Sequence, residues 1–325
     1  MRLPAIKTIR ALLVLGLAAA GLAAASPAAS AAPVSIDLCA RPGTATLTGA
    51  VTVPIWGFGI PATPGDCTTA TASLPGPQLV VTEGDTVTVN VTNALPAGHT
   101  LSFELPGVDF AAGPTDAAVG ATVTRTFTAS APGTYLYQSG GDAGRQEAMG
   151  LSGALIVRPA TANQAYDSTT TAYHVEAVLV LSAVDPNFNA SPDTFDMYGY
   201  HATYWLINGK AYPDTAPGIT AAPGQLVLLR YLNAGYDNTT MALLGMHERV
   251  VARSAHLLNN PFDAAAETIP AGATEDAIAT VPAGAAPSAN GYALYNRQLH
   301  LTNGPQAAPG PTPATGGGML TFIHP

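Results

Sequence analysis

Histidine and cysteine are the residues of this chain whose side chains could bind a transition metal, and their spacing decides whether they do. Imidazole nitrogen and thiolate sulfur are the usual protein ligands of copper and zinc. The seven histidines are His99, His174, His201, His247, His256, His300 and His324. No two are separated by one residue or by three, the spacings that place two side chains on one face of a strand or helix. No local pair of histidines therefore predicts a metal site.

Three histidines of the second half could still meet through the fold. His247 and His300 lie in apolar, strand-like contexts. If their strands and that of His324 are neighbours, three imidazoles would hold zinc or copper. The alternative, and the commoner role in such contexts, is a histidine that is hydrogen-bonded within the core.

The two cysteines are Cys39 and Cys67, both in the first third of the chain. In an exported protein they are expected to form one disulfide that ties the N-terminal strands to the first sheet. A nucleophilic cysteine needs a histidine that activates its thiol, and neither has one nearby in the sequence. Because no cysteine follows Cys67, the second half has no thiolate for a metal site.

One loop concentrates polar and charged side chains. Residues 140–147 include Asp142, Arg145 and Glu147, which could bind a polar ligand. The alternative is a solvated turn. The chain has neither a Gly-X-Ser-X-Gly nucleophile turn nor a Gly-Lys-Ser/Thr phosphate loop.

The composition excludes several classes of partner. Charged residues make up 10% of the chain. It contains 12 Lys and Arg and 21 Asp and Glu, which gives a net charge of −9. Nucleic acids and anionic membrane surfaces are bound by clustered Lys and Arg, so neither is expected as a partner. With 33 Gly, 28 Pro and 47% hydrophobic residues, the chain is typical of an all-β protein with many turns.

The N-terminus predicts export. Arg2, Lys7 and Arg10 precede an apolar run at 11–25, which is followed by a stretch of small residues. We assign this pattern, at residues 1–32, to a secretory signal peptide. The apolar run is shorter than the ~20 residues of a membrane-spanning helix, and no other segment qualifies as an integral membrane segment. We expect a secreted protein, extracellular or in the cell envelope, after cleavage of the signal peptide.

The elements that must position these residues are predicted to be strands. After a turn at Gly84, Val87, Val89 and Val91 alternate with Thr and Asn, which is the pattern of a half-buried strand. Similar segments lie around Val123 and Phe127 and at 134–137, 154–157, 174–181, 205–207, 226–232 and 319–323.

A polar stretch at 161–171 separates two strand-rich regions, 33–160 and 172–325, and is interpreted as a linker. Turns at Gly84 and Gly224 each precede an apolar strand that ends in Asn-Ala, so the regions resemble each other. Two similar β-sandwiches in tandem are the simplest explanation. The alternative is chance similarity between strands rich in Thr and Val.

The ordered turns resemble those of a known family. Blocks similar to the first cupredoxin domain of multicopper oxidases are Leu74–Gln78, Glu83–Asp85, Val91–Asn93, Pro132–Tyr137 and Met149–Val157. Blocks similar to the next domain are Ile207–Pro213, Asn233–Gly235 and Gly317–Leu320. The resemblance spans nearly the whole mature chain. It implies an all-β protein of two tandem cupredoxin-like Greek-key β-sandwiches, or barrels, and in particular a secreted bacterial member with two domains.

The family's chemistry, as the resemblance implies it, is the oxidation of phenols or metal ions by four coppers, with dioxygen reduced to water. It requires His-X-His pairs and a cysteine flanked by histidines. At the expected positions of two pairs this chain has Glu104 and Pro106, and Gln138 and Gly140. The flanked cysteine is absent. We therefore interpret these four residues as replacements of copper ligands and expect no cofactor.

Three hypotheses follow for the function. The first is a non-redox binding or structural module, whose small-molecule or cell-envelope ligand is unidentified. The second is a divergent copper-dependent oxidoreductase with an unusual copper site or one shared between subunits, because two-domain members of the family commonly trimerise. The third is a cell-envelope protein that presents its Gly- and Pro-rich loops to a partner. A homo-oligomer is compatible with each of them.

Overall fold

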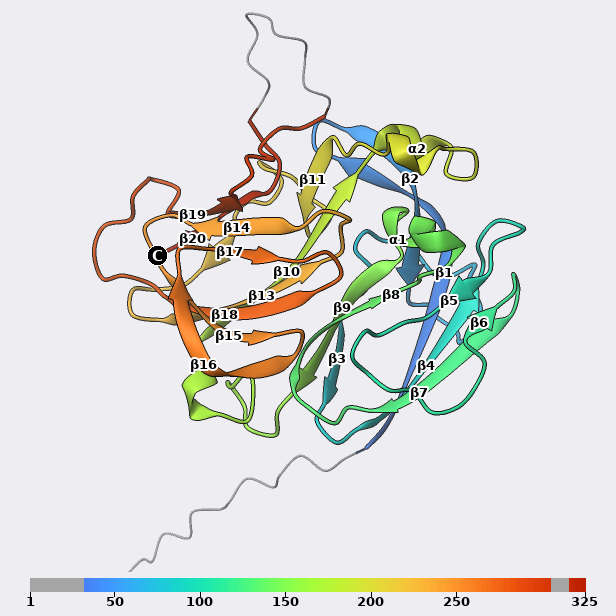
Figure 1. Cartoon of the computed structure of the whole chain (residues 1–325), viewed down its shortest axis with the longest axis horizontal. Helices are drawn as coiled ribbons and strands as arrows, with labels where there is room; N and C mark the ends of the chain where they lie inside the picture. The colour runs from blue at the N-terminus through green and yellow to red at the C-terminus, as the bar shows by residue number, and fades with distance from the viewer. Residues whose placement is uncertain (1–31, 305–315) are drawn as a thin grey trace, which may run out of the picture.

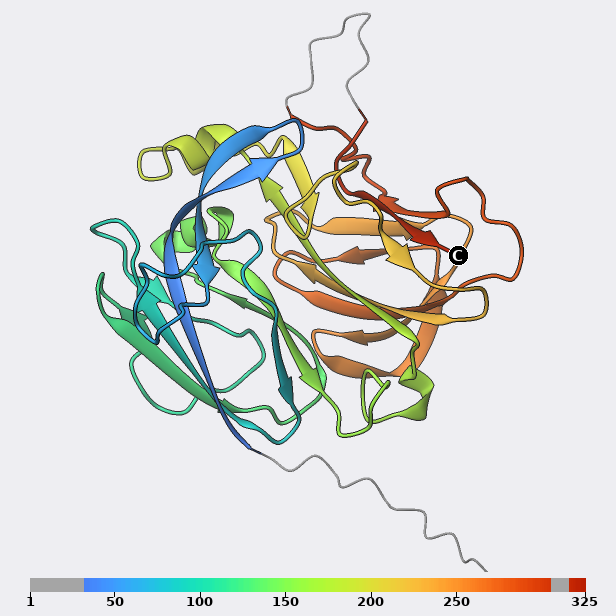
Figure 2. The same ribbon diagram turned by 180° about the vertical axis from the view of Figure 1, so that it is seen from behind.

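A computed structural model describes residues 32–304 and 316–325 of the chain. Within them the strands form two all-β units that lie side by side, as both views show (Figures 1 and 2). The signal peptide predicted at 1–32 lies outside the described residues, apart from its last position. No helix of the described residues is long and apolar enough to cross a membrane.

The first unit consists of two sheets and a short two-stranded ribbon. Its strands are β1 (Pro33–Leu47), β2 (Val51–Gly59), β3 (Leu79–Thr82), β4 (Thr86–Asn93), β5 (Leu101–Ser102), β6 (Asp116–Ala117), β7 (Thr122–Thr128), β8 (Gly133–Gln138) and β9 (Ser152–Arg158). One sheet has the order β2-β1-β4-β7, the other has the order β3-β9-β8, and β5 pairs with β6. A short helix, α1 (Arg145–Ala148), precedes β9.

Strand β4 shows why these residues form a sandwich. Val87, Val89 and Val91 are buried, and the Thr and Asn side chains between them lie on the other face. Successive side chains of a strand point to opposite faces, so an alternating sequence buries one face of the sheet. The alternation predicted from the sequence is confirmed.

The second unit has two larger sheets. Its strands are β10 (Val175–Val184), β11 (Tyr204–Ile207), β12 (Ile219–Thr220), β13 (Leu226–Asn233), β14 (Thr239–Leu243), β15 (Glu248–Arg253), β16 (His256–Ala264), β17 (Ala266–Ile269), β18 (Thr274–Thr280), β19 (Tyr292–Asn296) and β20 (Leu320–His324). The orders are β11-β10-β13-β18-β15-β16 and β12-β20-β19-β14-β17. Helix α2 (Pro186–Ala190) lies between β10 and β11. The expected architecture of two tandem cupredoxin-like sandwiches is confirmed.

The segment at 161–171 connects β9 to β10 and is not a free tether. Ala165 and Tyr166 are buried against Leu228 and Val251 of the second unit. The boundaries given above for the two domains remain a prediction, but this segment packs with the second unit.

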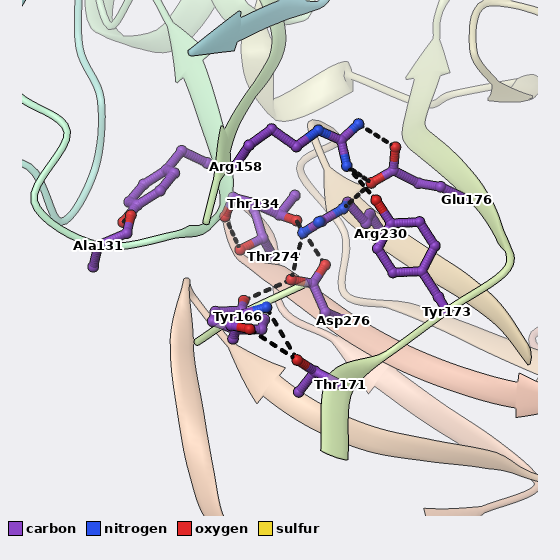
Figure 3. A network of polar contacts seen from close by, with 11 residues as sticks. Ala131, Thr134, Arg158, Tyr166, Thr171, Tyr173, Glu176, Arg230, Thr274 and Asp276 are labelled. Carbon is purple, nitrogen blue, oxygen red and sulfur yellow. Dashed lines mark hydrogen bonds and ion pairs between the residues drawn. The ribbon is translucent and has the colours of Figure 1, made fainter. Parts of the chain in front are cut away.

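A buried network of polar side chains joins the two units (Figure 3). Arg230 on β13 is fully buried, and its guanidinium contacts Glu176 at 2.7 Å and Asp276 at 3.1 Å. Thr134 on β8 of the first unit accepts a hydrogen bond from Arg230 at 2.9 Å and donates one to Asp276 at 2.6 Å. Tyr166 donates a second hydrogen bond to Asp276 at 2.6 Å. The first unit thus contributes hydrogen bonds to a buried ion pair of the second, although Arg230 Nη2 has no partner among the described residues.

Arg158, at the end of β9, extends this network. Its guanidinium pairs with Glu176 and donates to the hydroxyl of Tyr173 at 2.7 Å. The hydroxyl of Thr274 donates to the carbonyl oxygen of Thr134 at 2.8 Å. Because the hydrogen-bond partners come from both units, directional contacts as well as apolar packing fix the position of one unit relative to the other.

Candidate functional site

Two of the positions where we expect replaced copper ligands lie directly opposite each other. Glu104 follows β5, and Gln138 ends β8. Each backbone N–H donates to the other residue's carbonyl oxygen, at 2.8 and 3.0 Å. Gly140 lies against the Glu104 side chain, and a Cβ at Gly140 would be 2.5 Å from Glu104 Oε1. The structure therefore brings together three of the four residues.

The side chains at this position form a small acidic cluster. Gln138 Nε2 donates to Glu147 Oε1 at 2.6 Å, and the Ser102 hydroxyl donates to Glu104 Oε1 at 3.3 Å. Burial and the nearby charge of Glu104 raise the pKa of Glu147 to about 7, although the hydrogen bond from Gln138 opposes the shift. Near neutral pH, Glu147 can therefore hold or release a proton.

Next to this cluster, a buried hydrogen-bond chain runs through Gln146. The Ser139 hydroxyl donates to Gln146 Oε1 at 2.7 Å. Gln146 Nε2 donates to the Thr100 carbonyl oxygen at 2.9 Å and to Asp142 Oδ2 at 2.7 Å. Both ends of the amide are thus satisfied, as a buried polar group requires. Each polar atom of the Gln146 amide therefore has at least one hydrogen-bond partner.

His99 completes this arrangement, although no motif in the sequence assigns it a role. Its Nδ1 lies 2.8 Å from Asp142 Oδ2, and its Nε2 lies 3.3 Å from Asp193 Oδ1. Its ring packs against Trp56, with centroids 4.5 Å apart. Both ring nitrogens face carboxylates, so the imidazole holds two loops together.

Arg145 and Gly144 of the predicted polar-ligand loop contact the second unit. Arg145 donates to the carbonyl oxygens of Pro192 at 2.6 Å and Phe195 at 3.0 Å. Tyr236 donates through its hydroxyl to the Gly144 carbonyl oxygen. Asp142 and Arg145 thus attach this loop to its neighbours, and only Glu147 belongs to the acidic cluster.

Pro106 lies apart from the cluster. It borders a cavity of about 220 Å³ between the units, together with Thr134, His256 and Thr274. His256 Nδ1 lies 2.6 Å from the Ser254 carbonyl oxygen, so Nδ1 carries the hydrogen of that bond.

The three histidines of the second unit occupy separate environments. His247 is exposed between β14 and β15. His300 stacks on Trp205, with centroids 4.3 Å apart, and burial lowers its pKa. His324 lies beside Phe322 on β20. Within residues 32–304 and 316–325, no three His, Cys, Asp or Glu side chains are grouped so that they could hold a metal ion. The structure does not bring these histidines together.

The disulfide expected from the sequence is confirmed. Cys39 on β1 is bonded to Cys67 in the connection that follows β2. The described residues contain no free cysteine. Both thiols are used in a covalent link, so neither is free to act as a metal ligand.

Comparisons with known proteins agree with this architecture. A sequence profile described as multicopper oxidase matches residues 61–162. Over 224 residues, which are 60% of this chain and 67% of the relative, the chain is 30% identical to a copper-containing nitrite reductase of Alcaligenes xylosoxydans xylosoxydans. It is 29% identical to Laccase-15 of Oryza sativa subsp. japonica over 248 residues, which are 69% of this chain but only 40% of that laccase.

Solved structures share the fold. The blue copper oxidase of Nitrosomonas europaea superposes with a TM-score of 0.72 at 23% identity, covering 90% of this chain and 86% of that one. The copper nitrite reductase of the same organism superposes with a TM-score of 0.67 at 21% identity, covering 90% and 93%. At these identities the structural similarity supports the fold alone.

Proposed function

This chain belongs to the multicopper oxidase family, and we propose that it is a secreted member without the usual copper ligands that acts as a non-redox binding or structural module. The observation that carries the proposal is the Glu104–Gln138 pair. These residues occupy positions that the family resemblance assigns to copper ligands. Their side chains are a carboxylate and an amide, one next to Ser102 and the other hydrogen-bonded to Glu147.

The chemistry of the available donors does not fit the family's copper sites. Copper in such sites favours imidazole and thiolate ligands. Near Glu104 and Gln138 the donors are carboxylate, amide and hydroxyl groups, and the one imidazole, His99, has a carboxylate at each ring nitrogen. The two thiols are oxidised to a disulfide. For these reasons we derive no copper-dependent step.

Export is the second part of the proposal. A disulfide persists in an oxidising compartment outside the cytoplasm. The bond between Cys39 and Cys67 therefore supports the interpretation of residues 1–32 as a signal peptide. N-terminal sequencing of protein recovered from the culture medium or the cell envelope tests it, and a mature chain that still begins at Met1 would contradict it.

The main test is copper loading of the mature protein. After incubation with Cu(II) and removal of unbound metal, we expect less than one copper per chain, no intense blue absorption band and no oxidation of a phenol. The blue band requires a cysteine thiolate on copper, and both cysteines are disulfide-bonded. Stoichiometric copper together with phenol oxidase activity would overturn the proposal.

The alternative is a divergent copper-dependent oxidoreductase that uses an unusual site or one shared between subunits. The similarity to a copper-containing nitrite reductase over 67% of its length is the observation in its favour. It predicts copper binding that depends on oligomer formation or on the histidines of the second unit. If His247→Ala and His300→Ala leave both metal content and activity unchanged, that form of the alternative fails.

A further inference from the structure

A cavity of about 300 Å³ opens into the core of the first unit, lined by none of the site residues predicted from the sequence. It lies between β7 and β8, which are edge strands of the two different sheets. The loop that contains Val108 and Asp109 borders it, and the Ala111 N–H of this loop donates to the Thr126 carbonyl oxygen on β7 at 2.7 Å. The cavity is therefore a gap between sheet edges beside an anchored loop.

The floor of the cavity is apolar. Phe127, Leu155 and Val157 line it and are 4%, 2% and 1% exposed. Half-buried Tyr135 and Val108 form parts of its wall. Thr128 and Ser130 also line the cavity, so its accessible surface is mixed. Ligand sites in proteins commonly combine apolar and aromatic side chains with a few polar groups, and a volume near 300 Å³ is at the lower end of their range.

The rim of the cavity is negatively charged. Asp109 is exposed there, whereas its neighbours Val108 and Phe110 pack against the core. Among the described residues no hydrogen bond or ion pair engages the Asp109 carboxylate, and no lysine or arginine lines the cavity. Burial, followed by the charges of Glu83 and Asp276, raises the pKa of Tyr135 in the wall. The rim thus complements a cation.

We propose that this cavity binds a small aromatic amine, with its ring against the half-buried Tyr135 and Val108 and its ammonium group at Asp109. A volume of 300 Å³ equals that of about ten water molecules in the liquid, which suits one ring with a short aminoalkyl chain. The proposal goes beyond the non-redox function proposed for the chain. It does not depend on copper, because none of the residues that would contact the ligand belongs to the Glu104–Gln138 cluster.

The test is isothermal titration calorimetry of the mature protein with three matched probes. They are 2-phenylethylamine, neutral 2-phenylethanol and anionic 3-phenylpropionate. We expect saturable one-to-one binding of the amine, about tenfold weaker binding of the alcohol and no binding of the anion. Absence of saturable amine binding up to millimolar concentration, or equal affinity for the anion, would overturn the proposal.

Two variants locate the site. Asp109→Asn should weaken amine binding about tenfold and leave alcohol binding unchanged. Asp116→Asn, an exposed carboxylate of the same unit outside the cavity, should change neither. Val108→Trp should fill the cavity from its wall and abolish binding of both probes, with near-ultraviolet circular dichroism to verify the fold. Unchanged amine affinity in folded Asp109→Asn or Val108→Trp protein would refute the assignment.

Discussion

At the scale of single residues, buried carboxyl groups are the most sensitive features of this protein. Glu248 on β15 is fully buried, and Tyr231 donates a hydrogen bond to its Oε2 at 2.8 Å. Its Oε1 has no partner among the described residues. Burial and the nearby charge of Glu267 raise the pKa of Glu248 to about 7, although the hydrogen bond from Tyr231 opposes the shift.

This shift predicts how stability depends on pH. Because the folded state holds the proton that the unfolded state has already released, the free energy of unfolding falls as pH rises from the unfolded pKa near 4.5 through about 7. Relative to wild type, Glu248→Gln should gain roughly 3 kcal/mol between pH 4.5 and pH 8.5. Urea unfolding across this range measures the difference. A difference that is independent of pH would contradict the assignment.

The residues of the candidate site differ in how far the sequence could predict them. The family resemblance assigns Glu104, Gln138 and Gly140 to positions of two copper-ligand pairs, and in the structure the three residues lie together. The link from His99 to Asp193 could not be predicted, since Asp193 lies in an irregular connection of the second unit and no periodicity fixes its position. The resemblance places Pro106 beside Glu104, but nearby positions of an irregular segment can face different surroundings, and Pro106 borders the cavity between the units.

At the scale of elements, the Asn-Gly turn after β11 contacts two other parts of the fold. The sequence Asn-Gly predicts a tight turn, and Asn208 and Gly209 have φ values of 52° and 75°. Asn208 also pairs with β10, since its side-chain Nδ2 donates to the Val178 carbonyl oxygen and its Oδ1 accepts from the Val180 N–H, both at 2.8 Å. Gly209 lies against the Leu74 carbonyl group, closer than any Cβ could approach.

Gly209→Ala should therefore destabilise the protein by more than about 3 kcal/mol, because it adds a backbone clash to the cost of a positive φ. Gly224→Ala is the matched control. Gly224 has a φ of 83°, but no atom of the described residues lies within 4 Å of the position that a Cβ would take there, so only the backbone cost of about 1 kcal/mol applies. Thermal unfolding of the two variants compares them. Equal losses would mean that the contact with Leu74 is unimportant.

Strands with clear alternation or apolar runs, such as β4 and β13, are predictable from the sequence, whereas β1 is not. Its sequence contains Pro42 and Gly43, which usually mark a turn. In the fold β1 continues through both residues because it changes partner there: Pro33–Ala40 pair with β4, and Cys39–Leu47 pair with β2. Each half of β1 pairs with only one neighbouring strand, so its other edge is unpaired and tolerates proline and glycine, which a central strand would not.

At the scale of the whole molecule, the network around Arg230 determines how the units depend on each other. Arg230→Met leaves Asp276 without its buried counter-charge, whereas Glu176 keeps its ion pair with Arg158. Removing one partner of a buried ion pair commonly costs about 3–5 kcal/mol. We expect a loss of this size in urea unfolding. The control is Arg249→Met, which breaks an exposed pair with Asp263 at 3.4 Å and should cost less than about 1 kcal/mol. Similar small losses for both variants would show that the network contributes little.

The same contacts limit how this protein can be divided. A fragment that begins at residue 172 would keep Arg230 and Asp276 but lose the hydroxyl groups of Thr134 and Tyr166 that serve them. In this fragment the Arg230–Asp276 ion pair on β13 and β18 would lack these hydrogen-bond partners, and water would reach side chains that are buried in the intact chain. The tandem is therefore not a pair of interchangeable modules, and recombination at the connection between the units would separate groups that function only together.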